Sequence, residues 1–253
     1  MLASTAMVVT EATFGRNVLA ASLPVVVVFH SGSCAASRAL VPIIRRIGPA
    51  FGGQLVVALV DVDAETMIAD QYNVQAVPSL VVFQDGEPKL RLIGFAAEGL
   101  VQELFREAAG GCSTHMFWRP TEEAFEDAVL VPLLEDWRWQ YTRQAACVLH
   151  GGRRSRRGRV DILVHSAEPD RPLTLFENKR LVLGQRDVQA AVSQAEGYAE
   201  ALQAPSFVVA APSGMWVYAM HGRFAALDGR FSSLDVYQRP EELRDLLLRL
   251  HSG

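Results

Sequence analysis

The chain has 253 residues and almost no lysine, since Lys89 and Lys179 stand beside 22 arginines. The two cations are not interchangeable, because lysine is a compact ammonium on a flexible stem and arginine is a planar fork of donors. Lys179 follows the apolar run 173–176 and lies two residues after Glu177. A lysine that stands next to a carboxylate on an apolar strand, in a chain that otherwise uses arginine, is a candidate catalytic group. The alternative is an edge-strand lysine without a role, because Glu-x-Lys tripeptides are common.

Cysteine is also scarce, with three residues, Cys34, Cys112 and Cys147, scattered along the chain. Such a set is too small for a disulfide framework and favours a reducing compartment. The first thirty residues lack a basic start followed by a long apolar core and a cleavage site. The apolar run 25–29 is far too short to span a membrane. We therefore expect a cytoplasmic protein without a membrane partner.

Positive charge is not in excess, because the formal net charge is −4. No global basic field attracts nucleic acid, so any such site must be a local patch. The pattern Gly-x-x-x-x-Gly-Lys-[Ser/Thr] is absent, which excludes an ATP motor of that type. Half of the residues are apolar and about a fifth are charged, as in globular domains. The length allows one large domain or two ordinary ones.

Two α/β domains are predicted from the order of strand and helix signals. Residues 1–109 show alternating strand and helix signals and form the first predicted domain. Residues 110–120 contain Gly-Gly and Pro, show no hydrophobic periodicity and are interpreted as a linker. A new series of helix and strand signals begins at 121 and defines the second predicted domain, 121–253. Strands are expected at 7–9, 25–29, 55–62, 79–83, 89–93, 143–149, 159–165, 173–179, 207–211 and 215–220. Helices are expected at 10–21, 34–47, 64–72, 100–107, 121–133, 187–202 and 241–250.

The first domain resembles a thioredoxin, through the buried run 25–29, Cys34-Ala35-Ala36-Ser37, Val77-Pro78 and Gly94. The resemblance implies a thioredoxin-like fold with Cys34 at a helix start, where the dipole and free amides stabilise a thiolate. It also implies a cis-proline at Pro78 beside this cysteine. Ser37 stands where the family has its resolving cysteine, so an internal disulfide cannot close and ordinary dithiol turnover is excluded.

Three interpretations of this domain remain open. It is a partner-binding or dimerising module with a vestigial site, a one-thiol redox sensor centred on Cys34, or a glutathione-dependent monothiol enzyme. The partner protein cannot be identified from the residues.

In the second domain, Asp161 and Glu177 lie on consecutive predicted strands that can pair as a hairpin. Glu177 and Lys179 share one face because side chains alternate along a strand. Two adjacent carboxylates repel each other unless a cation neutralises them, which favours Mg²⁺ or Mn²⁺. Such an ion can activate water, and Lys179 can orient it or stabilise developing charge. A structural ion-pair cluster is the alternative.

The order of a helical glutamate, Asp161, Glu177-Asn178-Lys179 and Gln194-x-x-x-Tyr198 resembles the PD-(D/E)xK nucleases. The four elements together look like the nuclease domain at the N-terminus of type I restriction subunits and its stand-alone relatives. The resemblance implies a restriction-endonuclease-like α/β domain with a mixed central sheet and catalytic roles for Asp161, Glu177, Lys179, Gln194 and Tyr198. Ordinary helix packing is the alternative for the last two.

Two further sets of residues complete the predicted site. Glu122 is preferred as the third metal ligand because its spacing to 125 and 129 places it on the apolar face, with Glu123 and Glu126 as alternates. A basic loop running into the Asp161 strand is a candidate for phosphate contacts. Its arginines are Arg153, Arg154, Arg156, Arg157 and Arg159.

We therefore expect a metal-dependent endodeoxyribonuclease joined to a thioredoxin-like module for partner binding or redox sensing. RNA remains open as a substrate, and a homodimer is compatible with double-strand cleavage. Two rival interpretations are a non-catalytic interaction protein and a one-thiol redox protein centred on Cys34.

Overall fold

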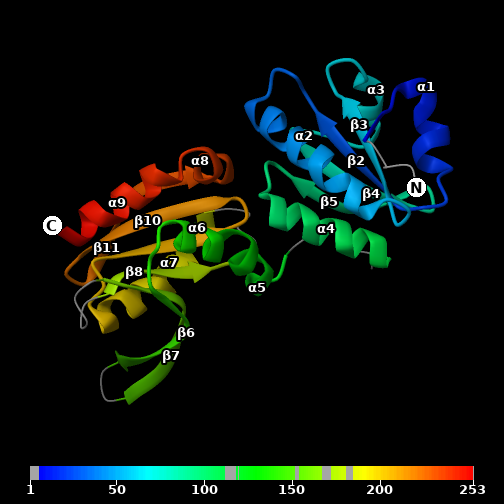
Figure 1. The fold of residues 1–253 in the computed structure, drawn as a ribbon. Coiled ribbons are helices and arrows are strands. Elements are labelled where there is room, and N and C mark those ends of the chain that lie inside the picture. Colours follow the sequence, from blue (N-terminus) through cyan, green and yellow to red (C-terminus); the bar gives the residue numbers. More distant parts are fainter. Residues whose placement is uncertain are drawn as a thin grey trace. The chain divides into compact units, whose positions relative to one another are not determined.

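The computed structural model describes residues 6–111, 118, 120–151, 154–166, 172–180 and 185–252, with the side chains of 150, 151, 154, 155 and 185 left out. Contacts within the chain divide it into two compact units, Met1–Pro120 and Thr121–Gly253. Each unit contains one β-sheet with helices packed on it (Figure 1). None of the described helices is long and apolar enough to cross a membrane.

The first unit is built on a five-stranded sheet of order β1-β3-β2-β4-β5. Its strands are β1 (Met7–Val8), β2 (Val25–His30), β3 (Val56–Asp61), β4 (Ser79–Gln84) and β5 (Glu87–Ile93). Its helices are α1 (Glu11–Phe14), α2 (Ala35–Ile47), α3 (Thr66–Gln71) and α4 (Glu98–Gly110). β2 runs parallel to β3 and antiparallel to β4, and β4 is antiparallel to β5.

Local sequence signals explain these elements. The run Val25 to Phe29 is fully buried, as expected for a central strand with helices on both faces. Thr10 forms a capping box with Thr13 at the start of α1. Asp85 and Gly86 both have positive φ and form the tight turn between β4 and β5. The helix predicted from residue 10 to 21 continues past α1 as a π-helical turn, Gly15–Leu19.

The predicted linker contains residues that belong to the first unit. α4 extends to Gly110, and Trp118 is buried, with its backbone amide bonded to Arg91 O and its indole bonded to Glu107. Residues 112–117 and 119 lie outside the described part of the chain, as does Cys112.

The second unit is built on a mixed six-stranded sheet of order β11-β10-β9-β8-β7-β6. Its strands are β6 (Tyr141–Gly151), β7 (Arg154–His165), β8 (Pro172–Asn178), β9 (Ser206–Ala211), β10 (Gly214–His221) and β11 (Phe224–Ser232). Its helices are α5 (Glu122–Phe125), α6 (Val131–Asp136), α7 (Gln185–Leu202), α8 (Ser233–Gln238) and α9 (Pro240–Ser252). β8 and β9 are parallel, and every other neighbouring pair is antiparallel.

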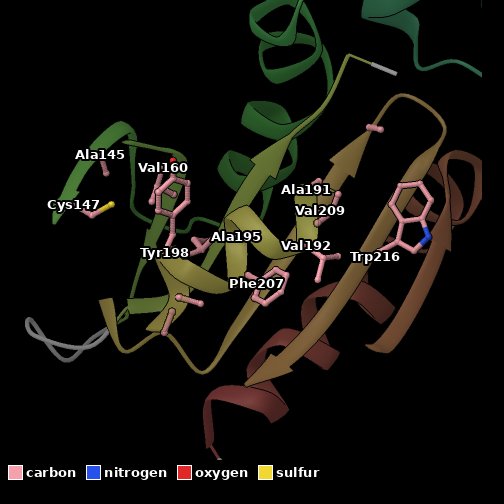
Figure 2. Packing of buried hydrophobic residues seen from close by; sticks show 14 residues of the cluster. Ala145, Cys147, Val160, Ala191, Val192, Ala195, Tyr198, Phe207, Val209 and Trp216 are labelled. Carbon is pink, nitrogen blue, oxygen red and sulfur yellow. The ribbon is translucent and has the colours of Figure 1, made fainter. Parts of the chain in front are cut away.

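One hydrophobic cluster joins α7 to the sheet (Figure 2). Tyr198 and Ala195 of α7 pack with Val160 and Cys147 at one end of the cluster, and Trp216 of β10 lies toward the other. Phe176, next in sequence to the cluster residue Leu175, points to the opposite face, because side chains alternate along a strand. That face of β8 and β9 is contacted by α9. The central strands are therefore covered on both sides.

Three features of this unit differ from the sequence-based expectations. β11 and α8 were not predicted. The arginine-rich segment was predicted as a loop, but from Arg154 onward it belongs to β7 and pairs with β6. Glu122 was predicted on the apolar face and is instead exposed, whereas Glu126 is buried. The buried positions of this helical segment are 125, 126, 130 and 134, and the π-helical turn Glu126–Leu130 interrupts the regular helical period between them.

Candidate functional site

The centre of the site is an ion pair at the end of β8. The Nζ atom of Lys179 donates a hydrogen bond to Oε1 of Glu177 across 2.6 Å. Glu177 is 1% exposed, and Lys179 is partly exposed. The backbone amide of Lys179 bonds to Ala210 O of β9, which holds the residue against the sheet. The predicted proximity of the two side chains is therefore found in the structure.

Asp161 reaches the same place from β7. The antiparallel register pairs Ile162 with Phe176, and the next position places Asp161 opposite Glu177. Oδ2 of Asp161 accepts the backbone N–H of Asn178 at 2.7 Å, and Oδ1 accepts the amide of Gln144 at 3.4 Å. Asp161 therefore ties β6, β7 and β8 together beside the ion pair.

The electrostatics of this cluster are dominated by Glu177. The pKa of Glu177 is raised to about 7, first by burial and then by the charge of Asp161, whereas the hydrogen bond and charge of Lys179 act in the opposite direction. The charge of exposed Glu122 adds a smaller increase. Oε2 of Glu177 is buried without a hydrogen-bond partner among the described atoms. A buried carboxylate in this state is costly unless a cation compensates it.

Asn178, the residue between Glu177 and Lys179, is held from a second direction. Its side-chain Nδ2 donates to Oε1 of Glu126 at 2.7 Å, and both residues are buried. Oε2 of Glu126 accepts a hydrogen bond from Nε of Arg143 at 2.9 Å and forms an ion pair with Nη2 of the same residue at 2.8 Å. Burial raises the pKa of Glu126, while Asn178 and Arg143 lower it. Glu126 therefore braces the site through Asn178.

α7 contributes the two residues predicted from its Gln-x-x-x-Tyr pattern. Oε1 of Gln194 lies 3.5 Å from Lys179 Nζ, and its Nε2 donates to the hydroxyl of Tyr198 at 3.3 Å. Residues four apart lie one helical turn along the same face, which aligns this pair. The structure therefore brings Lys179, Gln194 and Tyr198 into one hydrogen-bonded chain.

Three of the five predicted arginines have described side chains, namely Arg156, Arg157 and Arg159 of β7, and all three are exposed. Within the described part of the chain, no ion pair engages them. Arg153 and the side chain of Arg154 lie outside the described residues.

The fit of this cluster to a divalent cation rests on two carboxylates. Among the described residues, no group of three or more His, Cys, Asp or Glu side chains is arranged to hold a metal ion. Asp161 and Glu177 nevertheless repel each other, and no atom that the structure describes donates to the buried Oε2 of Glu177. A cation between them would relieve both costs, and oxygen atoms are the ligands that Mg²⁺ prefers. These two residues therefore fit the ion, and Glu126 is already occupied by Asn178 and Arg143.

A second candidate site lies in the first unit at the N-cap of α2, where Cys34 is half-buried. Its Sγ donates to the carbonyl of Val77, and the peptide bond from Val77 to Pro78 is cis. Burial raises the pKa of the thiol, but hydrogen bonds from Ser37 and Ala36 and the charge of Arg38 outweigh it. The net result is a pKa below the ordinary cysteine value.

Side-chain hydrogen bonds hold the loop before Cys34 in place. Ser31 bonds to Asp63 through its hydroxyl at 2.6 Å and to Ser37 Oγ through its amide at 3.3 Å. Arg38 donates to the carbonyls of Gly32 and Ser33. The described residues of the first unit thus form an α/β domain that presents the Cys34 thiol, with a lowered pKa, at the start of a helix.

Comparison with known proteins identifies this domain. The family model described as Thioredoxin matches residues 5–106. Thioredoxin 1 of Synechococcus elongatus is 34% identical over 91 residues, which cover 36% of this chain and 85% of that protein. Thioredoxin of Mycolicibacterium smegmatis is 35% identical over 104 residues, covering 40% of this chain and 93% of that protein. The chain therefore belongs to the thioredoxin family through its first unit.

A third relative combines two activities in its name. The bifunctional thioredoxin reductase/thioredoxin of Mycobacterium leprae is 34% identical over 86 residues, which cover 34% of this chain and 19% of that protein. The second unit is an additional sheet domain to which these comparisons assign no family.

Several residues of the second site were not singled out from the sequence. Gln144, Arg143 and Asn178 contact the carboxylates, and Glu126 was named only as an alternate. The one signal for Asn178 was an amide in an otherwise apolar strand next to Glu177. Arg143 and Gln144 carried no local signal, because their partners lie 16 to 17 residues away.

Proposed function

We propose that the second unit is a metal-dependent nuclease that hydrolyses phosphodiester bonds in DNA. The observation that carries the proposal is the buried Glu177 carboxylate, with Lys179 at 2.6 Å and Asp161 on the neighbouring strand. Two carboxylates and one ammonium around an unpartnered oxygen form a centre for binding a cation and a water molecule together.

Each residue of the site has its own role in the proposed reaction. Asp161 and Glu177 would hold Mg²⁺ or Mn²⁺, which when bound supplies an activated water and shields a phosphoryl oxygen. Lys179 orients the attacking water and stabilises negative charge that develops on the phosphate. Gln194 fixes the ammonium of Lys179 from the side of α7. Glu126 holds the intervening Asn178, so Glu177 in β8 and Lys179 directly after it keep their spacing.

The topology supports the same proposal. An antiparallel β6-β7-β8 meander is followed by α7 and then by β9, which is parallel to β8. This mixed sheet agrees with the restriction-endonuclease-like domain that the PD-(D/E)xK resemblance implies. In this proposal the thioredoxin-like unit recruits a protein partner, since Ser37 leaves Cys34 without a second thiol.

The test is cleavage of supercoiled plasmid with Mg²⁺ or Mn²⁺, and with EDTA as the metal-free control. Lys179→Ala should abolish nicking while the far-UV circular dichroism spectrum and melting curve remain those of a folded protein. Lys89→Ala is the matched control, because it removes the other lysine of the chain from the first unit. Equal cleavage by wild type and Lys179→Ala contradicts the proposal.

A second candidate function rests on the lowered pKa of Cys34 and on the thioredoxin relatives. A thiolate without a resolving partner supports one-thiol redox chemistry, in which Cys34 is oxidised by peroxide or forms a mixed disulfide. Such chemistry is compatible with the nuclease and would make the first unit its redox sensor.

A further inference from the structure

The hairpin of β6 and β7 turns from one face of the sheet to the other at Gln144. Arg143 lies opposite Ile162, which lies opposite Phe176, and cross-strand partners share a face of a sheet. Arg143 therefore stands on the Phe176 face. Ala145, two residues later, belongs to the cluster that packs on α7 at the other face. Residues two apart in a regular strand share a face, so the strand turns over between Arg143 and Ala145.

The backbone of Gln144 accounts for this turn. Its φ of 53° lies in the left-handed region, although the residue is part of β6. Residues other than glycine adopt such a φ uncommonly, and within a strand it rotates the following side chains relative to the preceding ones. The hairpin beyond Gln144 consequently turns toward α7, where Cys147 is buried beside Tyr198 (Figure 2). We call Gln144 the corner of the hairpin.

Asp161 stands directly across from this corner. The strand register on either side of it leaves Gln144 opposite Asp161 of β7. Nε2 of Gln144 donates to Oδ1 of Asp161 at 3.4 Å, and the backbone amide of Asn178 donates to Oδ2 at 2.7 Å. An ionised carboxylate only accepts, so the nitrogen of the Gln144 amide is the atom that faces it. The two donors fix the plane of the carboxylate and leave further lone pairs on each oxygen.

The second donor matters for the orientation of Asp161. An aspartate carboxylate that is held by one donor can rotate about its last torsion, which has broad energy wells. The Gln144 amide restricts this rotation and keeps the carboxylate beside Glu177 of the neighbouring strand. Residues that orient a metal-binding side chain in this way typically change metal affinity about ten- to a hundredfold when they are replaced. Gln144 therefore belongs to the site although it is exposed.

We propose that Gln144 is a positioning residue, which turns the hairpin onto α7 and holds the Asp161 carboxylate in the orientation that binds the divalent cation. The inference deepens the proposed function and rests on it for the role of Asp161 as a ligand. The turn of the hairpin does not rest on that function and is tested separately. One residue serves both purposes, because the corner brings the Gln144 side chain across to β7.

The first measurement follows the turn of the hairpin in EDTA, without metal. Cys147 is 6% exposed, and the rate at which iodoacetamide alkylates it reports how often the hairpin leaves α7. Gln144→Val should raise this rate about tenfold or more, because a β-branched residue hardly adopts a positive φ. Gln144→Gly accepts that φ and should keep the wild-type rate. Gln144→Thr imposes the same backbone restriction if the valine variant does not fold.

The second measurement is a calorimetric titration of the full chain with Mn²⁺ alone. Gln144→Met keeps the length of the side chain and its unbranched Cβ but has no donor, so it removes the contact with Asp161. It should weaken Mn²⁺ binding about tenfold, while the metal-free melting temperature and the Cys147 alkylation rate stay at their wild-type values. Gln140 is exposed directly before β6, so Gln140→Met and Gln140→Val are the matched controls for the two measurements.

The two measurements separate the turn from the contact with Asp161. Cys147 alkylation that is equally slow in wild type, Gln144→Val and Gln144→Thr overturns the corner. Equal Mn²⁺ affinity of wild type and Gln144→Met overturns the positioning of Asp161. Wild type that binds no Mn²⁺ contradicts the proposed nuclease, and with it the role of Gln144 toward the cation. The alkylation rates still decide the turn of the hairpin in that case, so the two failures are distinguishable.

Discussion

Lys179 and Glu177 are paired across 2.6 Å, and the partner of the exposed ammonium is a carboxylate that solvent hardly reaches. The pair is asymmetric, because Lys179 contacts one oxygen of Glu177 while the other oxygen is buried without a partner among the described residues. Asp161 lies on the adjacent strand and opposes ionisation of Glu177. The cluster therefore carries an electrostatic cost in the metal-free protein, and this cost can be measured.

The first prediction concerns stability against pH. The pKa of Glu177 is raised from 4.5 to about 7, so between these values the folded protein holds a proton that the unfolded chain releases. The free energy of unfolding therefore falls as pH rises through this window, by at most about 3 kcal/mol, and levels off above it. Glu177→Gln cannot ionise and should lack this decline.

Denaturant unfolding at pH 5, 6, 7 and 8 checks this, followed by tryptophan fluorescence because Trp137, Trp139 and Trp216 report on the second unit. Glu123→Gln is the matched control, since Glu123 is exposed on α5 and should keep the wild-type slope. Parallel curves for wild type and Glu177→Gln would show that Glu177 does not titrate in this range.

The second prediction tests whether Glu126 supports the structure of the site or binds the metal ion. Glu126→Gln weakens the contacts with Arg143 and alters the acceptor for Asn178, and it should lower the free energy of unfolding by about 2 kcal/mol. The loss should be the same with and without Mg²⁺. Glu123→Gln on the same helix should change stability by less than about 0.5 kcal/mol. A stability effect of Glu126→Gln that appears only with Mg²⁺ would instead make Glu126 a metal ligand.

The sequence predicted part of this site, because the periodicity of a strand can be read from residues that are neighbours in the chain. Alternation along β8 placed Glu177 and Lys179 on one face, and the hairpin placed Asp161 beside them. The contact of Glu126 with Asn178 spans 52 residues and depends on a π-helical turn, which a regular 3.6-residue count does not anticipate.

The missed and misassigned strands have a common cause. β11 is exposed along most of its length, with Phe224 at 78%, so it shows no apolar alternation. The start of β7 is rich in arginine and has no apolar alternation either. Both pair through backbone hydrogen bonds to neighbouring strands, and the side-chain pattern does not encode such pairing. The thioredoxin-like unit was predicted more completely because its three central strands, β2, β3 and β4, are buried and continuous in apolar sequence.

The third prediction tests the thiol of the first unit. Cys34 should be alkylated by iodoacetamide at pH 7 faster than Cys147, because its pKa is lowered and that of buried Cys147 is raised. Ser37→Ala removes a hydrogen bond to the sulfur and should slow Cys34 alkylation about three- to tenfold. Peptide mass spectrometry assigns each cysteine separately, and Ser33→Ala serves as the control because its hydroxyl bonds to Ser31.

Mild peroxide treatment extends the same comparison. Sulfenic acid or a mixed disulfide at Cys34, with Cys147 unmodified, supports a redox role for the first unit. Equal modification of both cysteines would mean that the α2 N-terminus does not activate Cys34.

The last prediction compares two glycines that face the same region. Gly158→Ala places a Cβ 2.6 Å from the Tyr198 ring and should lower the free energy of unfolding by about 1–3 kcal/mol, because ring or strand must move. Gly197 lies inside α7, and its added Cβ would approach no closer than 4.0 Å to Leu149. Gly197→Ala should therefore raise stability by about 0.5–1 kcal/mol through helix propensity alone. Opposite signs in denaturant unfolding would establish that close approach of Tyr198 to β7 requires the glycine at 158, and equal signs would contradict that packing.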